Sequence, residues 1–255
     1  MVLTTLNPCM QEIEKPVLSL IIPTYNESEN MPELIARIEK SLRDLSFELI
    51  VVDDNSPDGT AKIARTLNSI YGNITVCTRS NKLGLSSAVL HGFVGASGDV
   101  LGVIDADMQH PPEVLPKMFK EISSGSSLVI ASRYASGGGI EKLTFSRRLY
   151  SVGAIKLAHL LLPKTRKVKD IMSGCFMIRS DVLENVKLNP IGFKILLEIL
   201  SKCGIEAIKE VPYVFTNRLN GRSHLDQKEI QNYIFHLLKL FYNCTLHPNN
   251  HGLGS

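Results

Sequence analysis

The chain lacks any pair of cysteines spaced C-x-x-C, and its five cysteines are odd in number and scattered. Scattered thiols of this kind are typical of a reducing compartment, and they argue against both a disulfide framework and a zinc site. Long apolar runs are missing as well. No stretch reaches the ~18 to 20 apolar residues that cross a bilayer, and the beginning of the chain holds no signal-peptide core. We therefore expect a cytoplasmic protein that does not span a membrane.

A strong excess of one charge is also absent. The 255 residues include 28 Lys and Arg against 25 Asp and Glu, a formal charge of +3. This balance is too mild to indicate a nucleic-acid partner, so any basic site must be local. Because 44% of the residues are hydrophobic, the chain has enough apolar side chains for one globular domain with a short appendage.

Short apolar runs alternate with amphipathic segments from residue 17 onward. The runs predicted to be strands lie at residues 17–23, 47–54, 74–78, 100–107 and 127–133. Nearly continuous apolar strands that alternate with helices predict an α/β fold, with a mostly parallel sheet and helices on both faces. No G-x-G-x-x-G turn follows the first run and no G-x-x-x-x-G-K loop occurs, so a dinucleotide fold and P-loop chemistry are disfavoured.

Ligands of such sheets bind outside the carboxyl ends of the strands, and the segments that follow the predicted strands are polar. Asp105, Asp107 and Gln109 follow the fourth run at alternate positions, so in extended backbone they would project to one side. Two carboxylates and an amide suit Mg²⁺ or Mn²⁺ bound together with a diphosphate. The alternative is that Asp105 caps the next helix and Asp107 shapes a turn.

Asp53 and Asp54 follow the second run, near the start of a predicted helix. Carboxylates at such a position satisfy free backbone N–H groups, which explains one of the two acids better than both. We expect the other carboxylate to accept a hydrogen bond from a base or a ribose.

Taken together, these segments resemble the family-2 glycosyltransferases of the GT-A type, and most closely the dolichyl-phosphate mannosyltransferase group. The resemblance covers about residues 17–225, in the order IIPTYNESEN, ELIVVDDNSPDGT, NKLGL, DADMQHPPE, ASRY, SGCFMIRS and the R-x-x-G-x-S of 218–223. It implies a GT-A (Rossmann-like) enzyme that transfers a hexose, most often mannose from GDP-mannose, to a polyprenyl or dolichyl phosphate with inversion. The implied cofactor is Mg²⁺ or Mn²⁺.

The resemblance also assigns roles to individual residues. The nucleotide sugar would be held by Pro23, Tyr25, Glu27, Asp53, Asp54, Lys82, Gly84, Asp105 and Arg218. The metal would be bound by Asp105, Asp107 and Gln109. The residues expected to act in catalysis are Asp107, Arg133, Arg147, Arg148 and Ser173. The acceptor phosphate would meet Arg133, Arg147, Ser173, Ser223 and His224, the last of which replaces a usual lysine of the group.

The chemistry of the acceptor agrees with the scarcity of obvious bases at these segments. A phosphate monoester is already anionic at neutral pH, because its second pKa is about 6, so no general base is obligatory. Asp170 remains a candidate base if the acceptor is an alcohol. Arginines, whose planar forks hold phosphate oxygens, and a cation at the leaving diphosphate are what this reaction requires.

The predicted organisation is a flexible tail at 1–15, a catalytic domain at 16–225, an amphipathic helix at 226–246 and a disordered tail at 247–255. The helix and the apolar stretch at 149–162 are candidates for the membrane interface, with core packing as the alternative. We expect peripheral association with the cytoplasmic face of a membrane, through the chain's own helices or a small membrane-anchoring subunit. Two other functions stay open, a UDP-sugar-dependent transferase of the same type and a non-catalytic nucleotide-sugar-binding scaffold.

Overall fold

The computed structural model describes residues 15–140, 145–192, 194–216 and 227–246. Its centre is a seven-stranded sheet with the order β3-β2-β1-β4-β7-β5-β8. The strands are β1 (Leu18–Thr24), β2 (Phe47–Asp53), β3 (Ile74–Thr78), β4 (Val100–Val103), β5 (Leu128–Ser132), β7 (Phe176–Arg179) and β8 (Ile208–Pro212). All neighbouring strands are parallel except β7, which runs antiparallel between β4 and β5. The expected mostly parallel sheet is therefore confirmed.

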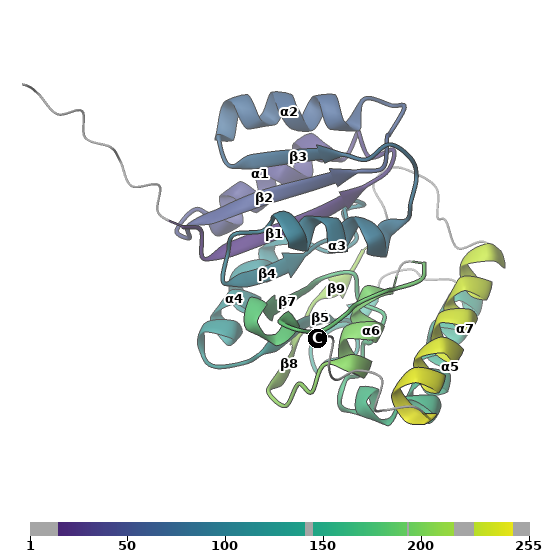
Figure 1. Ribbon diagram of the computed structural model, residues 1–255. Coiled ribbons are helices and arrows are strands. Elements are labelled where there is room, and N and C mark those ends of the chain that lie inside the picture. Colours follow the sequence, from purple (N-terminus) through teal and green to yellow (C-terminus); the bar gives the residue numbers. More distant parts are fainter. Residues whose placement is uncertain (1–14, 141–144, 193, 217–226, 247–255) are drawn as a thin grey trace, which may run out of the picture.

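Helices cover both faces of this sheet (Figure 1). One face carries α1 (Met31–Leu42), α2 (Thr60–Tyr71) and α4 (Leu115–Ser123), which follows a short 3₁₀ turn at Pro112–Val114. The other face carries α3 (Leu85–Gly95), α5 (Phe145–Leu161), α6 (Ile195–Lys202) and α7 (Gln227–Phe241). A separate pair of short strands, β6 (Gly139–Ile140) and β9 (Val214–Phe215), lies beside the sheet. None of the helices in the described ranges is long and apolar enough to span a membrane.

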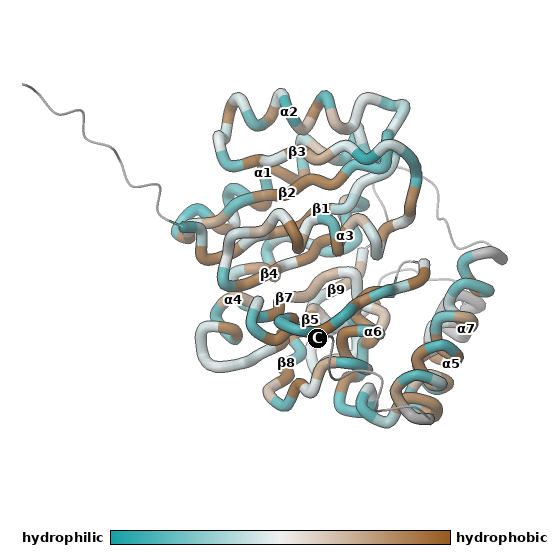
Figure 2. The backbone as a smooth tube through the Cα atoms, viewed as in Figure 1, coloured by the Kyte–Doolittle hydropathy of each residue, from teal (hydrophilic) through white to brown (hydrophobic). Residues whose placement is uncertain are grey.

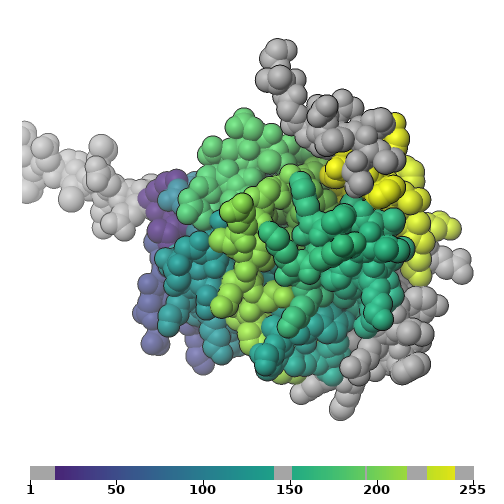
Figure 3. Space-filling view, turned by 90° about the horizontal axis from the view of Figure 1, so that it is seen from below, coloured from purple at the N-terminus to yellow at the C-terminus, as the bar shows by residue number. Residues whose placement is uncertain are grey.

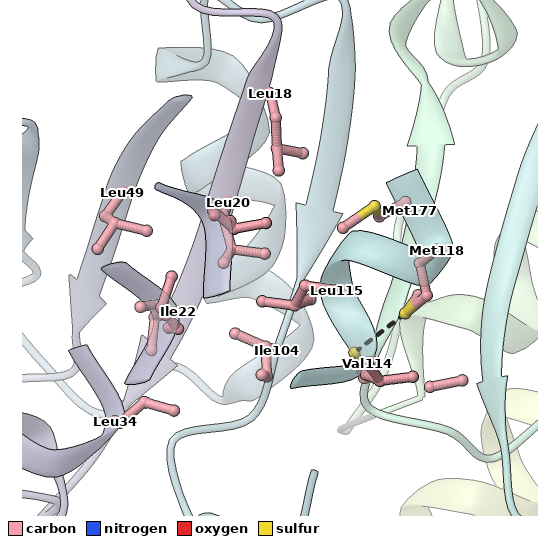
Figure 4. Packing of buried hydrophobic residues seen from close by; sticks show 14 of the residues in the cluster. Leu18, Leu20, Ile22, Leu34, Leu49, Ile104, Val114, Leu115, Met118 and Met177 are labelled. Carbon is pink, nitrogen blue, oxygen red and sulfur yellow. Dashed lines mark hydrogen bonds between the residues drawn. The ribbon is translucent and has the colours of Figure 1, made fainter. Parts of the chain in front are cut away.

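The central strands consist largely of hydrophobic residues, which Figure 2 shows in brown, and their side chains are buried on both faces of the sheet. Along β1, Leu20 and Ile22 join the core under α1 and α4, whereas Ile21 faces the opposite core. Figure 4 shows the first of these cores, where the sulfur atoms of Met118 and Cys175 lie 3.8 Å apart. Burial on both faces explains why the strands appear in the sequence as unbroken apolar runs.

Helices α5 and α7 lie side by side at the edge of the molecule, and Figure 3 shows the yellow surface of α7 beside that of α5. The buried side chains of α7, among them Tyr233 and Leu237, join the second core. On its outer side, Phe235 is 63% exposed and Leu238 53% exposed. One side of this helix therefore packs in the core, and the other side exposes apolar residues, for which a role at the membrane interface stays a prediction.

The position of the site follows from the strand order. From β1 the chain adds β2 and β3 on one side and then crosses to add β4 on the other side. The loops after β1 and β4 consequently diverge at the carboxyl ends of two neighbouring strands, which is where ligands bind in open α/β sheets. Residues 25–30 and 104–110 follow these two strand ends.

Candidate active site

Asp53 lies at the end of β2, and its side chain is fully buried. One carboxylate oxygen accepts hydrogen bonds from the hydroxyls of Thr24 (3.1 Å) and Ser56 (2.5 Å), and the other accepts from the Ser56 backbone N–H (2.9 Å). Asp53 therefore joins the ends of β1 and β2 and shapes the turn into α2. A role toward a nucleoside stays a prediction for this residue.

Asp54 organises a different loop. It forms an ion pair with Arg79, which follows β3, and both side chains are almost completely buried. Its other oxygen accepts the backbone N–H groups of Leu83 (3.1 Å) and Gly84 (2.9 Å). Gly84 has φ 97° at the start of α3, a left-handed conformation that favours glycine. Asp54 thus fixes the segment that contains Lys82 and Gly84.

Two of the expected nucleotide-binding residues lie in direct contact. The ammonium group of Lys82 lies 3.8 Å from the centre of the Tyr25 ring, a cation–π geometry. Pro23 lies near the end of β1, and Glu27 lies in the loop that follows. Glu27 accepts a hydrogen bond from the Asn30 amide (2.6 Å), and its backbone N–H donates to Thr60 (3.0 Å). The loops after β1, β2 and β3 are therefore joined at one edge of the sheet.

The segment from Asp105 to Gln109 differs from the expectation in its backbone. The extended conformation is wrong, because the chain turns here and Met108 has a positive φ of 62°. The backbone N–H of Gln109 donates to the Asp107 carboxylate (3.1 Å), so Asp107 does shape a turn. Asp105 does not cap the following helix, because Pro111 and Val114 occupy the caps there. A common direction of the three side chains therefore does not follow from strand geometry.

The donor atoms at this turn fit a hard divalent cation. Among the described residues, no three side chains of His, Cys, Asp or Glu gather into a closed metal-binding group. Two carboxylates and the amide of Gln109 would leave the other positions around the ion to phosphate oxygens, which is how Mg²⁺ is commonly bound with nucleotides. Asp105 and Asp107 are the residues that would hold such an ion, together with Gln109.

An aromatic wall borders the turn. His110 stacks on Tyr213, with ring centres 5.0 Å apart, and meets Phe215 edge-on at 6.1 Å. Burial lowers the pKa of His110 to about 3, and the nearby charge of Arg133 acts in the same direction. The imidazole is therefore neutral, and its Nδ1 lies 3.9 Å from the Asp105 carboxylate.

Arg133, directly after β5, is held by Asp170. The Asp170 carboxylate is fully buried and accepts from Nε (2.8 Å), Nη2 (2.6 Å) and the backbone N–H (2.9 Å) of Arg133. Burial alone would lower the pKa of Arg133, but the hydrogen bonds to Asp170 outweigh it and raise the pKa above its ordinary value. The guanidinium carbon also lies 5.2 Å from the centre of the Phe215 ring and 5.4 Å from that of Tyr134. Arg133 is thus a permanently charged group with a fixed orientation.

The segment that contains Asp170 also approaches the other charged groups. Gly174 lies against the Asp105 carboxylate, and the Met172 carbonyl accepts a hydrogen bond from Lys194 (3.0 Å) at the start of α6. Burial lowers the pKa of Lys194 to about 8, while the carboxylates of Asp105 and Asp170 partly offset the effect. Asp105, Arg133, Asp170 and Lys194 therefore lie within electrostatic reach of one another.

Ser173 is placed in this segment, but its hydroxyl is engaged locally. It donates to the Cys175 carbonyl and accepts from the Cys175 backbone N–H, both at 3.2 Å. Arg147 and Arg148 lie in the first turn of α5, and their side chains are outside the described part of the structure. Arg218, Ser223 and His224 lie outside the described residues. The roles of these six residues stay predictions.

Sequence reasoning missed four residues of this region, namely Arg79, Lys194, Glu210 and Gly174. Arg79 belongs to the polar segment after β3, where attention to its position would have found it. Lys194 gives a weaker signal, a single cation before the apolar run of α6. Glu210 on β8 carries none, because its importance lies in the backbone amides it contacts.

Comparison of the chain with known proteins identifies its family. The family Glycosyl transferase family 2 matches residues 19–187. A dolichol-phosphate mannosyltransferase from Pyrococcus furiosus is 50% identical over 223 residues, which is 88% of this chain and 63% of that protein. The chain thus spans less than two thirds of that relative. A dolichol-phosphate mannosyltransferase from Saccharomyces cerevisiae is 38% identical over 88% of this chain and 86% of its own length.

A solved structure confirms the fold. Glucosyl-3-phosphoglycerate synthase from Mycobacterium tuberculosis superposes with a TM-score of 0.67 over 89% of this chain and 80% of that one, at 23% identity. This likeness confirms the expected GT-A-like architecture. The chain belongs to glycosyl transferase family 2, and among the members of that family it is similar to the dolichol-phosphate mannosyltransferases.

Proposed function

We propose that this chain transfers a hexose, mannose from GDP-mannose, to a polyprenyl or dolichyl phosphate with inversion of the anomeric centre. The observation that carries the proposal is the placement of Asp105 and Arg133 around one group of rings: His110 lies 3.9 Å from the Asp105 carboxylate and meets Phe215 edge-on, and the Arg133 guanidinium lies 5.2 Å from the centre of the Phe215 ring. Acidic ligands for a cation at the leaving diphosphate and a fixed guanidinium for a second phosphate thus occur at one end of the sheet. The names of the relatives support mannose as the transferred sugar and dolichol phosphate as the acceptor.

Different residues would bind the donor and the acceptor. Tyr25, Lys82 and the loop fixed by Asp54 would hold the nucleoside. Asp105, Asp107 and Gln109 would bind Mg²⁺ or Mn²⁺, which supplies positive charge to the departing diphosphate. Support for a divalent ion comes from the M. tuberculosis synthase, whose structures contain Mn²⁺ with UDP-glucose and Mg²⁺ with UDP.

Arg133 would hold the acceptor phosphate. Its side-on pairing with Asp170 uses Nε and Nη2, so the Nη1 edge is the one a phosphate would meet. Both oxygens of Asp170 accept hydrogen bonds from Arg133, which makes Asp170 a support for the guanidinium rather than a base. The phosphate needs no base, since it is already anionic at neutral pH.

The test is transfer of labelled sugar into an organic-soluble product. The chain is incubated with a short polyprenyl phosphate, Mn²⁺ or Mg²⁺, and in parallel GDP-mannose, UDP-glucose or UDP-N-acetylglucosamine. The proposal requires product from GDP-mannose, loss of it with EDTA, and loss of it in Asp107→Ala but not in Asp99→Ala, whose exposed carboxylate pairs with Lys15. Product formed only from a UDP-sugar would show that the donor is that UDP-sugar and not GDP-mannose. No transfer from any of the donors would favour the scaffold function. Unchanged turnover in Asp107→Ala would show that Asp107 does not bind a required metal ion.

The lipid acceptor also requires a membrane surface, and we propose that α5 and α7 supply peripheral contact at the cytoplasmic face. Among the side chains that the structure describes, the large apolar residues exposed on these helices are Leu157, Leu160, Ile230, Ile234, Phe235 and Leu238. Apolar side chains on one side of a surface helix insert into the headgroup boundary. The chain should sediment with anionic phospholipid vesicles, and Phe235→Ser with Leu238→Ser should weaken this. No sedimentation of the unmodified chain would indicate that a small membrane-anchoring subunit is needed.

A further inference from the structure

Glu210 lies on β8, the edge strand of the sheet, opposite Ile130 of β5. Its two carboxylate oxygens accept the backbone N–H groups of two consecutive residues, Lys169 (3.1 Å) and Asp170 (3.0 Å). A carboxylate is suited to this task, because it only accepts hydrogen bonds and carries two oxygens at a fixed spacing. Glu210 therefore holds the backbone at the residue that binds Arg133.

Asp170, whose backbone Glu210 holds, binds Arg133 directly. Asp170 accepts three hydrogen bonds from Arg133 at 2.6 to 2.9 Å and is fully buried. Arg133 follows Ser132, which pairs with Pro212 two residues after Glu210. Both the backbone position and the side-chain orientation of Arg133 thus depend on the pair of strands that contains Glu210.

We propose that Glu210 is a positioning residue for the phosphate acceptor: it fixes Asp170, which in turn fixes the guanidinium of Arg133. This inference rests on the proposed function, since it takes the ligand of Arg133 to be an anionic phosphate. Glu210 itself does not touch that ligand. Its effect is geometric, and a misplacement of about 1 Å at a binding group can cost ~10²-fold in rate.

The experiment measures KM for the polyprenyl phosphate and for the nucleotide sugar in Glu210→Ala, Glu210→Gln, Arg133→Ala and the double variant Glu210→Ala/Arg133→Ala. Glu210→Ala should raise the acceptor KM by ~10-fold and leave the donor KM within about twofold, because Asp170 loses its backbone anchor. Glu210→Gln keeps one acceptor oxygen and should lie between. The double variant should be no worse than Arg133→Ala, since both changes act on one group. Lys209→Ala, an exposed neighbour on β8, is the matched control.

The outcomes distinguish the positioning role of Glu210 from the phosphate-binding role of Arg133. If Arg133→Ala raises the acceptor KM but Glu210→Ala behaves like Lys209→Ala, the positioning role is wrong and the proposed function stands. If Arg133→Ala leaves the acceptor KM unchanged, the phosphate role of Arg133 fails, and the positioning role fails with it. Additive effects in the double variant would also overturn the inference. If Glu210→Ala does not fold, the same comparison is made with Glu210→Gln, whose acceptor KM must rise.

Discussion

Gly174 lies directly against the carboxylate of Asp105: a Cβ atom at residue 174 would stand 1.8 Å from Asp105 Oδ2. Two heavy atoms that are not bonded to each other cannot lie this close. Any side chain at residue 174 must therefore displace Asp105 or the segment that carries Asp170. The tight fit connects a candidate metal ligand with the support of Arg133.

Gly174→Ala is therefore expected to lower the affinity for Mn²⁺ and the turnover by at least ~10-fold. Insertion of a methyl group into a filled site also costs about 1 to 3 kcal/mol of stability. Metal affinity is measured by titration with Mn²⁺ and stability by urea denaturation. Gly153→Ala is the control, because a Cβ atom added to this exposed glycine of α5 would meet no other segment within 4 Å. Normal Mn²⁺ affinity in Gly174→Ala would contradict this prediction, because it would mean either that the new side chain does not displace Asp105 or that Asp105 does not bind the ion.

Arg79→Lys should weaken binding of the nucleotide sugar. Arg79 contacts Asp54, Ser87 (2.8 Å) and the Gly84 carbonyl (2.9 Å) through different nitrogens, and a lysine ammonium cannot replace this fork. We expect the donor KM to rise ~10-fold and stability to fall by about 1.5 to 3 kcal/mol, the usual range for a hydrogen bond to a charged group. The acceptor KM should not change.

The control for this variant is Arg65→Lys on α2. Arg65 donates a hydrogen bond to the Thr78 hydroxyl (2.7 Å) in an exposed position. Its replacement should alter neither KM. A normal donor KM in Arg79→Lys would show that the loop at residues 79–84 does not contribute to donor binding.

The fold was predictable because strands buried on both faces appear in the sequence as apolar runs, and the polar segments that follow them lie at the ligand-binding edge. The insertion of β7 between β4 and β5 was not predictable in this way. Its position depends on pairing between segments far apart in the chain, and its own sequence carries no sign of the antiparallel direction. The turn at Met108 was missed for a local reason, since a non-glycine residue with positive φ is uncommon.

The candidate site was predictable at the strand ends and less so beyond them. Motifs indicate residues that meet ligands, whereas Glu210 and Lys194 act on the protein's own backbone carbonyls, amides and charges. The same limit applies to Asp54. The sequence allows its carboxylate either to accept backbone N–H groups or to bind a base or a ribose, and these two roles differ only in what the carboxylate contacts. Its contacts with Arg79 and Gly84 became visible only in three dimensions.

Lys194→Met is expected to separate metal binding from turnover. The ammonium group lies within electrostatic reach of Asp105 and competes with a cation there, so its removal should raise the affinity for Mn²⁺ by about 5-fold, or ~1 kcal/mol. Turnover should fall, because the Met172 carbonyl loses its donor and the site loses a positive charge near the phosphates. Manganese titration and steady-state rates measure the two effects. Lys117→Met, on the exposed side of α4, serves as the control, and a weaker affinity for Mn²⁺ in Lys194→Met would contradict the argument.

The contact between α6 and α7 should depend on pH through Glu198. Its buried carboxylate pairs with Lys202 at 2.5 Å, accepts the Asn189 N–H at 2.8 Å, and lies 3.4 Å from His236 of α7. Burial alone would raise the pKa of Glu198, but these contacts outweigh it and hold the pKa below the ordinary 4.5. A lowered pKa in the folded state means that the contribution to stability is present above about pH 4.5 and is lost as the pH falls through the folded-state value.

Glu198→Gln should therefore lower the free energy of unfolding at neutral pH by about 3 kcal/mol. This is the usual cost of removing one partner of a buried ion pair, because the other charge is left buried and unpaired. The variant should also lose less stability than the unmodified chain between about pH 5 and about pH 3, since it lacks the carboxylate that must take up a proton. Urea denaturation at several pH values measures both effects, with the exposed Glu206→Gln as the control. Parallel pH profiles for Glu198→Gln and the unmodified chain would show that another group is responsible for the acid sensitivity of this helix pair.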